Sequence, residues 1–132
     1  MGLFSIFKKK AENLTTDRKL DRMWELWAED KLDLPCKKLM TYESEVDNGG
    51  HSQYFFNVSN SGNLAEEVTA LLSMLPEPLR GNLARGYAAF SEQDGISDDV
   101  NDALFEECDD VFYEHEQRII DMIYEAAKNF VM

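Results

Sequence analysis

The segment from Glu45 to Asn57 carries the most specific arrangement of polar side chains in the chain. Two adjacent glycines allow a positive φ and close backbone approach, and amide, imidazole and phenol groups follow them. The set comprises Glu45, Asn48, Gly49, Gly50, His51, Gln53, Tyr54 and Asn57. Two interpretations are open. Either the segment is a helix junction whose amides, Gln53 and Asn57, bond exposed backbone, or it lines a small pocket or groove that receives part of a partner.

Candidate metal ligands and nucleophiles are few and widely separated. Cys36, His51, Cys108 and His115 are the only cysteines and histidines, and none pairs at a short spacing such as Cys-x-x-Cys or His-Glu-x-x-His. Nothing orients Cys36 toward His51 as a thiolate–imidazole pair would require. We therefore expect no catalytic residue, no metal and no cofactor. The rival hypothesis is an enzyme that binds a small molecule or a metal at the 48–57 junction.

The two histidines are expected to have different surroundings. His115 lies between Phe112 and Ile119 on an apolar helix face, so we expect it to be packed and hydrogen-bonded. His51 follows the glycines and is the better candidate for an exposed residue, although it could also cap the short helix that begins there.

Apolar residues recur at helical spacing along most of the chain. This pattern predicts an all-α fold, a single compact domain of about six or seven helices. Helices are expected at about 16–30, 35–48, 51–57, 63–75, 78–90 and 98–129. The last is either continuous or broken near Asp109-Asp110, and a shift of its apolar stripe favours the break. Gly81 and Gly86 weaken the helix that contains them, which a close helix crossing or a dynamic helix would explain equally.

Residues 1–14 are expected to form an apolar and basic N-terminal tail or short helix, and residues 15–132 a single acidic helical domain. The apolar run before Lys8-Lys9-Lys10 is too short for a secretory signal, and its positive charges are on the wrong side. Weak contact of this tail with an anionic membrane is the lesser interpretation. Cys36 and Cys108 lie within apolar helical patterns rather than a disulfide framework, which indicates a reducing, cytoplasmic environment.

The chain is strongly acidic, with 26 Asp and Glu against 13 Lys and Arg. A body this negative repels nucleic acid and attracts basic proteins. No Lys or Arg occurs between residues 86 and 117. On a helix, carboxylates four residues apart are separated by about 6 Å along the axis. This separation is on the scale of that between successive phosphates of one DNA strand, whose axial rise is about 3.4 Å per nucleotide and whose backbone path is longer. The predicted partner-binding residues are Glu106, Glu107, Asp110, Glu114, Asp121 and Glu125; a solvated acidic face is the alternative.

The motif Glu45…Asn48-Gly49-Gly50-x-x-Gln53-Tyr54-Phe55-x-Asn57 resembles the central motif of the bacterial DNA-mimic protein family. The resemblance covers about residues 21–130 and includes softer helical patterns such as Ala65 with Leu71-Leu72, Leu83 with Ala88 and Phe90, and Asp109 with Tyr113. It implies an all-helical domain without a cofactor. It also implies an acidic surface that imitates duplex phosphates and occupies the DNA-binding surface of a transcription factor. The motif positions are structural landmarks in that family. The C-terminal third of this chain has no motif match, so the family's acidic surface cannot be assigned to particular residues there.

Together, the charge and the resemblance favour a non-enzymatic, acidic protein-binding module. Its expected partner is a basic, nucleic-acid-binding protein, toward which it would act as a DNA mimic. Direct binding to nucleic acid is not expected. An immunity-type inhibitor that blocks a toxin with a basic cleft is the second binding hypothesis. A monomer and a homodimer are both compatible with the sequence.

Overall fold

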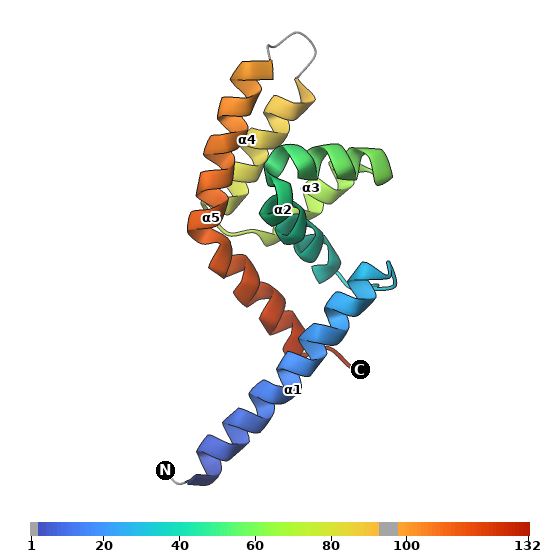
Figure 1. Ribbon diagram of the computed structural model, residues 1–132, viewed down its shortest axis with the longest axis vertical. Coiled ribbons are helices and arrows are strands. Elements are labelled where there is room, and N and C mark those ends of the chain that lie inside the picture. The colour runs from blue at the N-terminus through green and yellow to red at the C-terminus, as the bar shows by residue number, and fades with distance from the viewer. Residues whose placement is uncertain (1–2, 93–97) are drawn as a thin grey trace.

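The computed structural model describes residues 3–92 and 98–132 (Figure 1). Within these ranges the chain forms five helices and no strand: α1 (Leu3–Ala28), α2 (Cys36–Ser61), α3 (Leu64–Met74), α4 (Leu79–Ser91) and α5 (Asp98–Lys128). The all-α prediction for a single compact domain is confirmed, but the predicted count of six or seven helices is wrong. The helices expected on either side of Gly49-Gly50 are two halves of α2, and α5 continues through Asp109-Asp110.

The first helix begins at Leu3 rather than near Thr16. Its N-terminal half extends away from the rest of the molecule (Figure 1). The hydroxyls of Thr15 and Thr16 donate to the carbonyls of Ala11 and Glu12, each at 2.9 Å, so these polar residues continue the helix instead of starting it. The C-terminal half packs on the body through the fully buried Met23.

Short-range sequence signals end and begin the middle helices. The side chain of Asn63 accepts a hydrogen bond from the backbone N–H of Glu66 at 3.2 Å, as expected for the start of α3. Pro76 and Pro78 follow α3 and separate it from α4. Gly86 allows α4 to pass close to α2, because a Cβ at this position would lie 3.3 Å from the ring of Phe55.

The core lies where α2, α4 and α5 meet. Its centre is aromatic: Tyr42 makes edge-on contacts with Tyr54 and Phe112, at centroid distances of 5.1 and 5.5 Å. All three side chains are fully buried. The break that the sequence favours in the last helix is wrong: the buried residues of α5 follow one face, and the helix changes direction partway along without breaking (Figure 1).

Candidate functional site

The glycine pair redirects α2. Gly49 has φ −154° and ψ 17°, and Gly50 has φ 79° and ψ −179°, so neither has helical geometry. The residue with the positive φ is Gly50, not Asn48 or Gly49 as expected for a simple helix end. The chain resumes a helix at once, which brings His51 and Tyr54 into the core beside Tyr42.

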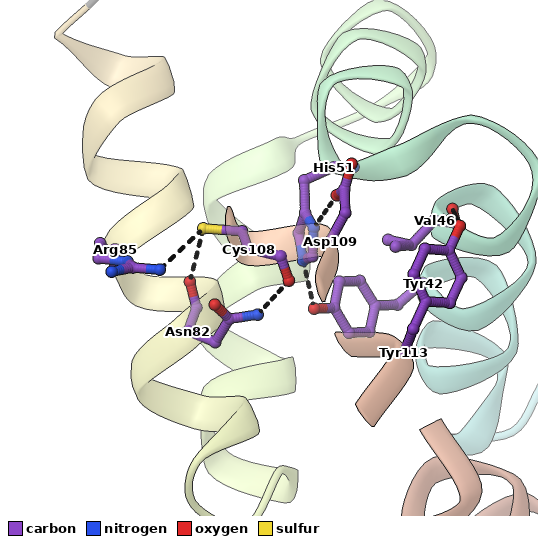
Figure 2. Close-up of polar contacts among 8 residues, drawn as sticks. All are labelled: Tyr42, Val46, His51, Asn82, Arg85, Cys108, Asp109 and Tyr113. Atoms are coloured by element: carbon purple, nitrogen blue, oxygen red, sulfur yellow. Dashed lines mark hydrogen bonds and ion pairs between the residues drawn. The ribbon is translucent and has the colours of Figure 1, made fainter. Parts of the chain in front are cut away.

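Asp109 of α5 lies against this junction. Its Oδ1 accepts hydrogen bonds from the backbone N–H of His51 at 2.8 Å and from the ring Nδ1 at 2.6 Å. Because Nδ1 donates to the carboxylate, Nε2 of a neutral ring is the acceptor for the hydroxyl of Tyr42, at 2.7 Å. Figure 2 shows these contacts in a line from α5 through His51 to the first half of α2. We call Tyr42, His51 and Asp109 the His51 cluster.

The expectation that His51 is exposed is wrong. Its side chain is 0% exposed, as is Tyr42. Burial is tolerated because both ring nitrogens have partners. The order tyrosine–imidazole–carboxylate resembles an acid–base relay, yet no surface of the first two groups is open to a substrate. The cluster therefore joins the two halves of α2 to α5. His115, in contrast, is half-buried on α5.

The motif amides bond a side chain rather than exposed backbone. Gln53 Nε2 and Asn57 Nδ2 both donate to Oε2 of Glu45, at 2.9 and 2.8 Å. Glu45 precedes the glycines and the two amides follow them, so this second set of contacts also spans the junction. The pocket interpretation receives partial support only: Gln53 and Asn57 border a hollow, whereas His51 and Tyr54 are buried.

The cysteines are free and buried, as their apolar surroundings indicate. Burial raises the pKa of both thiols, which disfavours the reactive thiolate. Cys108 also contacts Asn82 of α4. Its carbonyl accepts a hydrogen bond from Asn82 Nδ2 at 2.8 Å, and its thiol contacts the carbonyl of Asn82 at 3.7 Å (Figure 2). These contacts connect α4 to α5 beside the His51 cluster.

Three carboxyl groups that the sequence did not single out converge between α2 and α5. Oxygens of Glu43, Asp47 and Glu116 lie within 4.8 Å of one another, a spacing that could hold a cation. A proton shared between Glu43 and Glu116 would also account for carboxyl groups this close together. Burial, followed by the hydrogen bond to Glu116 and the charges of Glu116 and Asp47, raises the pKa of Glu43 from 4.5 to about 7.

This raised pKa predicts a pH-dependent stability. The folded protein holds a proton on Glu43 that the unfolded chain releases above pH 4.5, so stability falls as pH rises from 4.5 through about 7. We expect Glu43→Gln to raise the free energy of unfolding by about 1 kcal/mol near pH 8, a value reduced for contact with water. Near pH 4.5 the substitution should have little effect. Urea titrations at both pH values measure the difference. Glu114→Gln, at an exposed α5 carboxyl, is the control, and an equal gain in both variants would contradict the assignment.

All six predicted partner-binding acids are exposed on α5. At about 100° per residue they fall within an arc of about 100°, opposite the buried Phe112 and Ile119. We call this set the acidic ridge: Glu106, Glu107, Asp110, Glu114, Asp121 and Glu125. Two members have ion pairs within the chain, Glu107 with Arg85 at 3.7 Å and Glu125 with Lys128 at 2.8 Å. For the other four, the described residues form no ion pair within 4 Å.

Within the described residues, no helix has both the length and the apolar character needed to cross a bilayer. A family model described as DMP19-like protein matches residues 38–130, which span almost all of α2 and the whole of α3, α4 and α5. No curated protein and no solved structure matches the chain. Because the family model covers more than half of the chain, the chain belongs to the DMP19-like protein family.

Proposed function

We propose that this protein is a non-enzymatic DNA mimic whose acidic ridge occupies the nucleic-acid-binding surface of a basic protein. The observation that carries the proposal is the exposure of six carboxylates along one face of a single helix. The ridge extends about 28 Å from Glu106 to Glu125. A duplex places several phosphates on each strand over that length, so a DNA-binding surface would meet negative charge along its whole extent.

The surroundings of the ridge support this role. Arg118 is the one lysine or arginine of α5 between Glu106 and Glu125, and its guanidinium donates to the carbonyl of Glu77 at 2.9 Å instead of to a ridge carboxylate. The carboxylates without ion pairs repel one another and keep their charge available. A cationic partner relieves that repulsion, speeds association and makes the complex sensitive to salt.

Charge reversal tests the ridge. With the protein immobilised and exposed to native cytosol at low salt, we expect retention of nucleic-acid-binding proteins that elute in a salt gradient or with duplex DNA. The double substitution Asp110→Lys with Glu114→Lys should weaken binding of a purified captured protein by roughly tenfold or more. Isothermal titration calorimetry measures that change.

The matched control reverses two exposed acids, also four residues apart, on α1: Asp17→Lys with Asp21→Lys. It alters net charge by the same amount away from the ridge. Equal losses of affinity in both double variants would indicate attraction by net charge alone. Unchanged binding after reversal at Asp110 and Glu114 would exclude the ridge as the binding surface.

A further inference from the structure

Two hollows lie next to each other on the exposed side of the 49–57 segment. The first, of about 600 Å³, has an apolar wall made by Phe56, Phe90 and Phe105 and a polar border that includes Gln53 and Asn57. Phe105 is buried and Phe90 is half-buried. Both pack against the core ring of Phe55, with distances between ring centroids of 5.9 Å for Phe105 and 5.3 Å for Phe90. Phe56 stands out, because 61% of it is exposed.

The second hollow is acidic. It has a volume of about 370 Å³, and Glu43, Glu45 and Asp47 line it together with Ser44, Asn48 and Gln53. Gln53 lines both hollows, so they share this side chain as part of their border. None of the described residues that line either hollow is a lysine or an arginine. The surface thus combines an apolar recess with the carboxylates of Glu45 and Asp47, which no lysine or arginine of the described lining neutralises.

The border between the hollows is held in place. Oε2 of Glu45 accepts from both Gln53 and Asn57, and Gly49 leaves space for Gln53, since a Cβ at that position would overlap its amide. A surface whose polar side chains are already fixed loses less conformational entropy when it binds. The exposed half of the 45–57 motif therefore has a preformed shape, while its other half is core.

We propose that this surface binds a segment of a basic protein, with an apolar side chain of the segment against Phe56 and a neighbouring lysine or arginine in the acidic hollow. The inference rests on the proposed function for its basic partner. It adds an anchor to the electrostatic attraction of the acidic ridge. Charge complementarity selects the partner and its orientation, whereas an apolar side chain in a desolvated recess supplies affinity that salt does not screen.

Two short peptides of equal length and charge test the anchor. One alternates arginine with leucine, and the other alternates arginine with serine. We expect the leucine peptide to bind the wild-type protein about tenfold more tightly, and Phe56→Ser to remove most of that advantage. Val131→Ser, at an apolar side chain that is 86% exposed elsewhere, should leave the advantage intact. Fluorescence anisotropy gives the affinities.

A second measurement does not depend on a variant. In amide NMR spectra of the wild-type protein, the leucine peptide should shift the signals of Gly49, Ser52 and Asn57 more than the serine peptide does. Equal affinity of the two peptides, or a leucine advantage that survives Phe56→Ser, would overturn the proposal. The proposed role of the acidic ridge is tested separately. If the ridge does not bind the basic partner, charge reversal at Asp110 and Glu114 will leave binding of the serine peptide unchanged, whatever Phe56 contributes.

Discussion

Asp109→Ala is expected to lower the free energy of unfolding by about 3 kcal/mol, because it leaves two donors of His51 without an acceptor. In the intact protein one carboxylate oxygen accepts from the backbone N–H and from the ring Nδ1. His51 is fully buried, so water does not replace these bonds without opening the junction. The loss extends to Tyr42, whose hydroxyl depends on the same ring for its partner.

Urea denaturation followed by circular dichroism measures this loss. The neighbouring Asp110→Ala removes an identical side chain that is exposed on the ridge, and should change stability by no more than about 0.5 kcal/mol. Asp109→Asn retains one acceptor oxygen and should give an intermediate value. If Asp109→Ala cost no more than Asp110→Ala, the His51 cluster would not be what joins α2 to α5.

The helices and the ridge follow from sequence periodicity. Spacings of three and four place Phe112 and Ile119 on one side of α5 and the acids on the other, and this assignment needs no information from elsewhere in the chain. The direction change at Gly49-Gly50 was likewise predictable, because a glycine pair within a helical pattern marks a positive φ or a close approach.

The His51 cluster could not be assembled in the same way. Asp109 lies four residues after Phe105 and three before Phe112, so a carboxylate occupies the buried stripe of α5. That position was the available signal that Asp109 differs from Asp110. Its partner, however, is 58 residues earlier in the chain, and a single sequence does not specify which helices pack together. The same limit applies to Glu43, because its raised pKa comes from burial and from its proximity to Glu116 rather than from any local motif.

The start of α1 shows a different limit. The sequence suggested a tail or short helix over residues 1–14 and a first helix that starts near Thr16. The structure instead places Thr15 and Thr16 within one continuous helix, where each hydroxyl bonds the carbonyl four residues earlier. Because such a bond satisfies the hydroxyl inside a helix, these polar residues do not mark the start of α1.

Gly50→Ala should also be strongly destabilising, by about 3 kcal/mol, for two separable reasons. The φ of 79° disfavours any side chain. In addition, a Cβ at this position would overlap Oδ2 of Asp109 and lie 3.1 Å from its Cγ, which forces the carboxylate away from His51. Gly62→Ala is the matched control. That glycine has an extended φ of −168°, and the nearest atom to an added Cβ is 4.0 Å away, so we expect a change within about 0.5 kcal/mol.

A double-mutant cycle separates the two reasons. In an Asp109→Ala background the overlap with the carboxylate is absent, so Gly50→Ala should cost only its backbone strain, about 1 kcal/mol. The two single losses would then exceed the loss in the double variant by about 2 kcal/mol. Urea titrations of the four proteins give this coupling directly. Additive losses would mean that Gly50 is required for its backbone angle alone; coupled losses would mean that the glycine also makes room for the carboxylate that holds His51.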